Sequence, residues 1–180
     1  MSKIISLEAQ RNQKAAKRGF REWQRRFRSL PALDERTKWS DLPDELILFL
    51  AEDDEEGRRI IHDLLMGSLG LGTGYDFESL PSETLLPLLD IYFILIDQVR
   101  FECMRRLNWV REIPFGNQPL IPLIRAFRQG SNLALIEPPK LSSGHPSFPT
   151  YAKLMDMEQR VFIRKLIPEA VAQFKEKINP

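Results

Sequence analysis

The sequence has few of the residues that form reactive or metal-binding sites. Among its 180 residues are one cysteine, Cys103, and two histidines, His62 and His145. A single cysteine excludes an internal disulfide framework and a cysteine-based zinc site, and it is typical of a reducing compartment. We therefore expect a cytoplasmic protein with no cofactor and no bound metal, and the sequence favours a non-catalytic role.

Long apolar runs are also missing. The most apolar stretch, Leu85 to Ile96, is interrupted by Pro87 and Asp90. It is shorter than the ~18–20 residues that a helix needs to cross a bilayer. The N-terminus has no apolar core of the kind found in secretory signals. We therefore expect a soluble protein without a transmembrane segment, in which this stretch forms a buried helix, kinked at Pro87 or beginning just before it.

Apolar residues recur at helical spacing through most of the chain, which predicts an all-α fold. We expect one domain over residues 1–180, an irregular bundle of about five to seven helices around a central hydrophobic helix at about 82–111. The other expected helices are 3–30, a short one ending near Leu50, 54–66 with Gly67 as its C-terminal cap, about 119–129, and a last one beginning after Thr150 and divided at Pro168.

Proline is concentrated in one region. Residues 113–149 hold seven of the thirteen prolines, and proline interrupts both helices and central strands. Apart from the helix at 119–129, this segment is predicted to be irregular, with a brief extended stretch at 133–136.

The formal net charge of +1 hides a strong local asymmetry. Residues 1–30 contain nine Lys or Arg and two acidic residues, a net charge of +7. Residues 31–57, which we call the acidic segment, contain ten acidic and two basic residues, a net charge of −8. The near-neutral total excludes a global preference for nucleic acid or anionic membrane, so any electrostatic recognition must be local.

The basic N-terminal segment is predicted to be amphipathic. Its apolar stripe is Ala16, Phe20, Trp23, Phe27 and Leu30. What we call the basic stripe repeats the same spacing two positions out of phase and consists of Lys14, Arg18, Arg21, Arg25 and Arg28. Two residues correspond to about 200° of helical rotation, so the stripes lie nearly opposite, along about 21 Å of helix.

These stripes carry the main functional prediction, a non-catalytic interaction or adaptor module that docks through the N-terminal helix. The candidate partner-binding residues are Lys14, Arg18, Arg21, Arg25, Arg28, Phe20, Trp23 and Phe27. We expect a protein partner or a second copy of the chain first, a nucleic-acid backbone second and a membrane surface third. The alternative is internal: the aromatic stripe joins the core and the arginines face water, some of them pairing with the acidic segment.

A metal-dependent hydrolase is the third hypothesis. His62-Asp63 resembles the paired ligand of the HD-type metal-dependent phosphohydrolases, which are also all-helical. That family needs further His and Asp ligands, and the resemblance covers these two residues alone. Asp90 and Asp97 lie seven residues apart on one predicted helix face, so they are the other residues to inspect for such a site.

Overall fold

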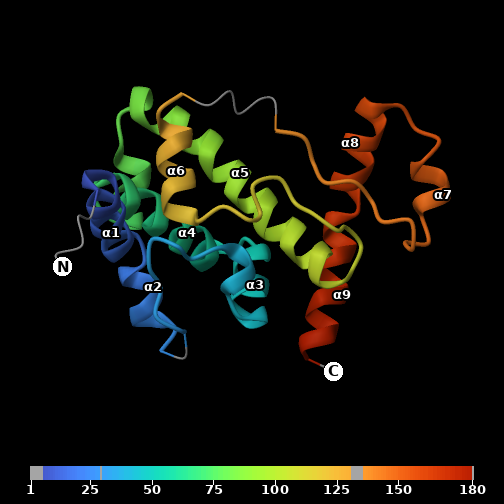
Figure 1. Ribbon diagram of the computed structural model, residues 1–180, viewed down its shortest axis with the longest axis horizontal. Coiled ribbons are helices and arrows are strands. Elements are labelled where there is room, and N and C mark those ends of the chain that lie inside the picture. Colours follow the sequence, from blue (N-terminus) through green and yellow to red (C-terminus); the bar gives the residue numbers. More distant parts are fainter. Residues whose placement is uncertain (1–5, 29, 131–135, 180) are drawn as a thin grey trace.

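The computed structural model describes residues 6–28, 30–130 and 136–179 (Figure 1). This part of the chain forms nine α-helices, two short 3-10 helices and no strand, so the predicted all-α class is confirmed. The elements are α1 (Leu7–Gly19), α2 (Arg21–Arg26), η1 (Trp39–Asp41), α3 (Asp44–Ala51), α4 (Glu55–Leu69), η2 (Gly74–Ser79), α5 (Ser82–Arg106), α6 (Leu120–Arg128), α7 (Phe148–Tyr151), α8 (Asp156–Lys165) and α9 (Ile167–Ile178).

The described residues contain more helices than expected, for two reasons. The single N-terminal helix predicted over 3–30 is divided: α1 ends at Gly19, Phe20 has φ −94° and ψ 1°, and α2 ends at Arg26. The single turn of α7 precedes the last helices and contains Thr150, which we expected as the cap of the last helix; α8 instead begins at Asp156. The predicted division of the last helix near Pro168 is confirmed, because α8 and α9 meet there at Leu166.

Helix α4 ends later than predicted. It continues to Leu69 and stops at Gly70, whose φ of 72° is the left-handed conformation that glycine adopts readily. The Leu71 amide donates to the Met66 carbonyl at 2.8 Å, which closes the end of the helix. Gly67, which we predicted as the cap, is instead buried inside the helix and serves a packing role described below.

The central helix is confirmed, and its C-terminal end is the one that differs from the prediction. It begins at Ser82 and includes Pro87, and it stops five residues short of the predicted end at Arg111. Asn108 has φ 61°, and the Trp109 amide donates to the Met104 carbonyl at 2.9 Å. This Schellman arrangement satisfies the last carbonyl groups of α5 and terminates the helix.

Helix α5 runs across the molecule (Figure 1). Its side chains contribute to two hydrophobic clusters. In the first cluster, Leu88, Leu95 and Val99 of α5 pack among residues of α1 to α4 and α6, and α9 adds Phe174. In the second, Phe101 and Met104 pack with the loop after α5 and with α7 to α9. Full burial of such a side chain stabilises the fold by roughly 1.5–3 kcal/mol. Because α5 contributes side chains to both clusters, it is the scaffold of the structure. The single-domain organisation stays a prediction.

The proline-rich region matches its prediction where it is described. Helix α6 lies within the expected 119–129 range, and residues 136–147 are irregular apart from one antiparallel bridge between Val110 and Leu141. Most of the extended stretch expected at 133–136 lies outside the described residues. Across the described ranges, no helix combines the length and the hydrophobicity needed to span a membrane.

Candidate functional site

The basic stripe lies on the surface. Lys14 and Arg18 on α1, Arg21 and Arg25 on α2, and Arg28 just after α2 are all exposed. The Phe20 amide donates to the Ala16 carbonyl at 2.9 Å and the Gln24 amide donates to the Phe20 carbonyl at 3.0 Å, so helical hydrogen bonding continues across the break. The stripe therefore keeps one solvent-facing side although the helix is divided.

The aromatic stripe lies on the opposite side and belongs to the core. Phe20 and Trp23 are buried, with 1% and 0% of their surface exposed. The Trp23 indole N–H donates to the Ile60 carbonyl of α4 at 2.7 Å. Phe27 is partly buried, with its ring centroid 5.4 Å from that of Phe49 on α3. In this structure these three side chains are part of the protein's own packing and not an open docking face.

A close glycine contact places α1 against α4. A Cβ atom added at Gly67 would lie 2.6 Å from the carbonyl carbon and oxygen of Arg18 and 2.7 Å from the Cα of Gly19. A Cβ atom added at Gly19 would lie 2.7 Å from the Ser68 hydroxyl. Both distances are too short for a side chain, so the two glycines let the backbones approach. This contact brings the basic side chains of α1 to the C-terminal end of α4.

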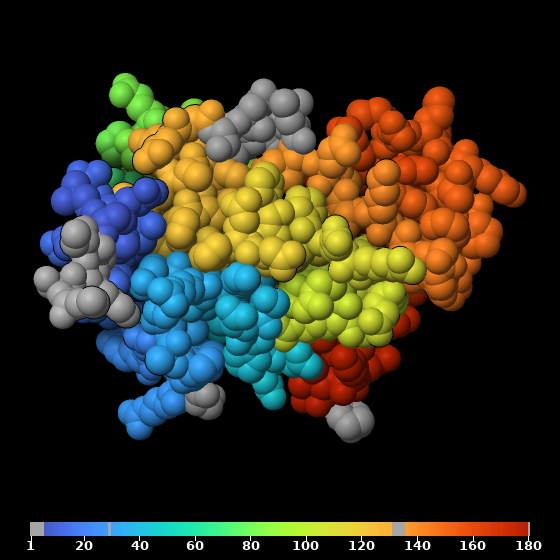
Figure 2. Space-filling view, viewed as in Figure 1, coloured from blue at the N-terminus to red at the C-terminus, as the bar shows by residue number. Residues whose placement is uncertain are grey.

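Helix α6 adds two more cations beside α1, which the sequence analysis missed. Its last turn carries Arg125 and Arg128, and Figure 2 shows the surfaces of α1 (blue) and α6 (orange) next to each other. Together α1, α4 and α6 line a surface pocket of about 400 Å³, which we call the basic pocket. Its lining residues are Arg11, Lys14, Arg18, Ser68, Leu69, Arg125, Arg128 and Gln129.

The basic pocket carries positive charge without carboxylates in its lining. Arg125 donates to the Asn12 side-chain oxygen at 2.6 Å and Arg18 donates to the Gly67 carbonyl at 3.1 Å, so both acceptors are neutral. In the described part of the chain, no carboxylate pairs with any of the five cations of the pocket. The C-terminal dipoles of α1, α4 and α6, whose last turns contribute lining residues, offset part of this charge.

Four of the ten acidic residues of the acidic segment form ion pairs in the described part of the chain, all with cations outside the basic stripe. Lys175 of α9 binds Glu52 at 2.7 Å, and Arg100 of α5 binds Asp53 at 3.4 Å. Two further carboxylates are paired: Arg106 binds Asp44, and Arg26 binds both oxygens of Glu56 at 3.0 Å, while Arg59 lies 3.5 Å from the same carboxylate. Within the stripe, Arg25 pairs with Glu22 of its own helix at 2.7 Å.

The residues considered for a hydrolase do not form one site. The His62 ring stacks on Phe77, with centroids 3.7 Å apart, and burial and the nearby Arg58 lower the pKa of His62 to about 4. Asp63 is buried and accepts a hydrogen bond from the Gly74 amide, and burial raises its pKa. Asp97 pairs with Arg164 at 3.3 Å, and Asp90 is exposed. Over the described ranges, no three His, Cys, Asp or Glu side chains are grouped so that they could hold a metal ion.

Cys103 is buried in α5, and burial raises the pKa of its thiol to about 12. A thiol is nucleophilic only as the thiolate. Cys103 therefore stays protonated at neutral pH and packs as a small hydrophobic side chain in the first cluster.

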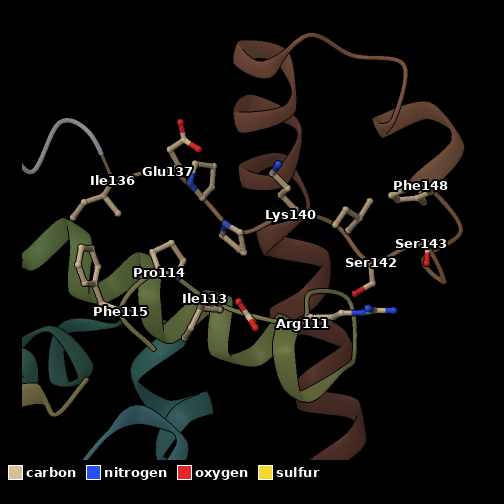
Figure 3. A pocket seen from close by; sticks show the side chains of 14 residues that line it. Arg111, Ile113, Pro114, Phe115, Ile136, Glu137, Lys140, Ser142, Ser143 and Phe148 are labelled. Atoms are coloured by element: carbon tan, nitrogen blue, oxygen red, sulfur yellow. The ribbon is translucent and has the colours of Figure 1, made fainter. Parts of the chain in front are cut away.

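A larger cavity of about 750 Å³ lies beside the loop after α5 (Figure 3). It is lined by residues 111–115, by residues 136–143 and by Phe148. Its charged side chains include both signs, and Arg160 binds one of them, Glu137. We assign no ligand to this cavity, because its polar groups do not converge on one point as they do in small-molecule sites.

Comparison with protein-family models, with curated proteins and with solved structures gave no match to this chain. Any function must therefore be argued from the side chains themselves, and the exposed basic surface of α1, α2 and α6 is the most distinctive feature available.

Proposed function

We propose that this protein is a non-catalytic helical interaction module that docks an acidic segment of a partner protein through the basic stripe. The observation that supports the proposal is a contrast in pairing: the stripe is exposed and has one local ion pair, Arg25 with Glu22, whereas four carboxylates of the acidic segment pair with cations outside the stripe. Unpaired cations on one surface attract a partner of opposite charge and accelerate its association.

The burial of the aromatic stripe separates this proposal from the other two partner classes. Membrane binding by an amphipathic helix needs its apolar face free to enter the lipid, whereas Phe20 and Trp23 are buried in the first cluster. Single-stranded nucleic acid is usually held by exposed aromatic rings as well as by cations. A partner that requires only cations, an acidic protein segment, fits the exposed residues best.

A phosphate backbone is the second candidate, because Arg125 and Arg128 extend the positive surface beyond the stripe. Nucleic acid bound in this way would show affinity that falls steeply with salt. A second copy of this chain fits less well, since several carboxylates of its acidic segment are already used in internal ion pairs.

The test uses the full chain and three fluorescent probes in anisotropy titrations at low salt: a Glu/Asp-rich peptide, single-stranded RNA and duplex DNA. We expect the acidic peptide to bind, and we expect binding to weaken by at least about tenfold when Arg18, Arg21 and Arg25 are jointly replaced by Glu. A matched control replaces Arg36, Lys153 and Lys165 by Glu, which makes the same charge change at other exposed positions.

The outcomes separate the candidates. If the stripe variant and the control variant lose the same affinity for the acidic peptide, the effect depends on net charge alone. That result would contradict a docking surface. Binding of RNA or DNA without binding of the peptide would replace the protein partner with nucleic acid. Both variants must first match the parent in circular dichroism and in thermal unfolding, so that a folding defect is not read as lost binding.

A further inference from the structure

The basic pocket combines features that the basic stripe does not have. It is concave, it joins residues more than a hundred positions apart in the chain, and five basic residues line one volume of about 400 Å³. Such a volume lies at the lower end of the range for small-molecule sites, roughly 300–1,000 Å³. The pocket is therefore large enough for a small ligand, and its chemistry must identify that ligand.

The charge of the lining indicates a highly charged anion. Five cations, Arg11, Lys14, Arg18, Arg125 and Arg128, surround the pocket without a carboxylate among its lining residues. One phosphate group carries a charge of about −1.5 to −2 at neutral pH. A single phosphate would leave much of this positive charge unbalanced, whereas two or three linked phosphates balance most of it.

Two of the arginines are already held in place. The Nε of Arg18 donates to the Gly67 carbonyl at 3.1 Å, and Nη1 of Arg125 donates to the Asn12 side-chain oxygen at 2.6 Å. Each bond uses one N–H of a guanidinium that has five, so the others stay available for a ligand. Arginine presents these donors as a planar fork that matches phosphate oxygens, and a fixed fork loses less entropy on binding.

The remaining lining residues argue against recognition of a base or a hydrocarbon tail. Among the described residues that line the pocket, Leu69 is the only large apolar one and none is aromatic. Ser68 and Gln129 add a hydroxyl group and an amide, although the Ser68 hydroxyl donates to the Leu64 carbonyl. The pocket can therefore recognise phosphate groups but has no surface on which a nucleobase would stack.

From these observations we infer that the basic pocket binds a short linear polyphosphate, a chain of two or three phosphate groups. The phosphate oxygens accept hydrogen bonds from Arg18 and Arg125, and Arg11, Lys14 and Arg128 close the open side. This inference goes beyond the proposed function, and it holds whether or not the basic stripe docks a protein. Lys14 and Arg18 belong to both surfaces, so a bound polyphosphate would compete with an acidic partner there.

The experiment is isothermal titration calorimetry of the full chain at low salt without divalent cations. The titrants are inorganic phosphate, pyrophosphate, tripolyphosphate, ATP and, as an anion control, sulfate. We expect affinity to rise from phosphate to pyrophosphate to tripolyphosphate, and we expect ATP to bind no more tightly than tripolyphosphate. Tighter binding of ATP would overturn the inference in favour of a nucleotide site, and tripolyphosphate binding no tighter than sulfate would overturn it altogether.

Variants locate the binding. Joint replacement of Arg125 and Arg128 by Gln should weaken tripolyphosphate binding by at least about tenfold, since it removes two of the five cations. The matched control, joint replacement of Arg21 and Arg25 by Gln, removes two cations of the stripe outside the pocket and should change affinity by less than about threefold. Equal losses in the two variants would mean diffuse counterion binding and would contradict a built site.

A second variant is needed because Arg125→Gln also removes the hydrogen bond to Asn12 and could affect folding. Arg11→Glu changes an exposed residue of the pocket and should weaken tripolyphosphate binding to a similar degree, with unchanged circular dichroism. The two inferences can fail separately. Weaker binding of the acidic peptide by the variant changed at Arg21 and Arg25 tests the stripe. Weaker binding of tripolyphosphate by the variant changed at Arg125 and Arg128 tests the pocket.

Discussion

The basic stripe and the acidic segment are neighbours in sequence with opposite charge, yet the fold uses them differently. Carboxylates of the acidic segment are bound by Arg100 and Arg106 of α5 and by Lys175 of α9. The basic stripe faces water, and its contact with a carboxylate in the described chain is the local pair between Arg25 and Glu22. Four carboxylates of the acidic segment are therefore held by cations outside the stripe, whereas the basic stripe is exposed.

The difference arises from where each segment lies relative to the core. Asp54 caps α4 by accepting from the Gly57 amide at 2.6 Å, and Glu55 and Glu56 occupy its first turn, where the helix dipole favours anions. The basic stripe lies on the side of α1 and α2 that faces away from their buried aromatic residues. Opposite net charge on adjacent segments therefore does not mean that the segments neutralise each other.

The largest expected effect comes from disrupting the contact between α1, which carries part of the basic stripe, and α4. Gly67→Ala places a methyl group within 2.6 Å of the Arg18 backbone, which has no rotamer to relieve the overlap. Helices α1 and α4 must move apart, and we expect the free energy of unfolding to fall by about 3–4 kcal/mol. Urea denaturation followed by circular dichroism measures this loss.

Gly144→Ala is the matched control, since no atom lies within 4 Å of the added Cβ. It should change the free energy of unfolding by less than about 0.5 kcal/mol. A tolerated Gly67→Ala would show that α1 and α4 do not approach as closely as described and would undermine the basic pocket as well.

The next prediction compares Arg106, which binds a carboxylate of the acidic segment, with Arg21 of the basic stripe. Arg106→Gln removes a side chain that binds Glu102 at 2.8 Å and also binds Asp44, and Glu102 has only 1% of its surface exposed. Because Arg105 still binds Glu102 at 2.6 Å, we expect a loss of about 2–3 kcal/mol rather than the full loss for an unpaired buried charge. Arg21→Gln, on the stripe, should stay within about 0.5 kcal/mol of the parent in the same denaturation experiment. Similar losses in the free energy of unfolding of both variants would show that Arg106 contributes no more to stability than an exposed cation of the stripe.

The surroundings of the acidic segment can be tested by measuring stability as a function of pH, since His62 lies near Asp53 and Arg58. Its pKa in the folded protein is about 4, below the ordinary value of 6.5, so the unfolded chain binds more protons between these pH values. Stability should therefore fall as pH is lowered from about 6.5 to about 4. With allowance for solvent screening, His62 should account for about 1–2 kcal/mol of this fall.

His62→Gln removes this titration, so its pH profile between 4 and 7 should be flatter than that of the parent by that amount. The comparison of the two profiles cancels the contributions of other titrating groups that the two proteins share. Parallel profiles for the two proteins would contradict a neutral, stacked His62.

The smallest effect concerns repulsion within the basic pocket. Lys14→Gln removes one of five neighbouring cations, so the free protein should become more stable by about 0.3 kcal/mol at low salt. The gain should vanish at about 0.5 M salt, where the Debye length is only a few ångströms. Thermal unfolding at the two salt concentrations measures it, with Lys153→Gln as the exposed control, and a destabilised Lys14→Gln would argue that the cations do not repel one another.

Several features of the fold were predictable because they depend on neighbours within one or two helical turns. The apolar run gave the central helix, Pro168 marked the division between the last two helices, and the 119–129 range contains α6. The opposite phases of Arg18 and Trp23 also correctly separated the exposed side of α1 and α2 from the buried side. Helical periodicity carries this information locally.

Other features depend on which elements meet, and periodicity does not contain that information. The division at Phe20 accompanies the packing of Phe20 and Trp23 against each other, with ring centroids 5.5 Å apart. Gly67 looked like a helix cap because glycine is common there, but its missing side chain is used where α1 crosses α4. A glycine that ends a helix and one that admits a neighbouring backbone look the same in sequence.

The chain's residues alone therefore establish an all-α protein with a buried central helix and a basic stripe opposite an aromatic one. Arg125 and Arg128 are two ordinary basic residues at the end of a predicted helix, and no local pattern connects them to Lys14 or Arg18. Only the close crossing of α1 and α4, with α6 packed alongside, brings these cations into one pocket. The physical reason is that a helix face is set by spacing along the chain, whereas a site between helices is set by how closely their backbones can approach.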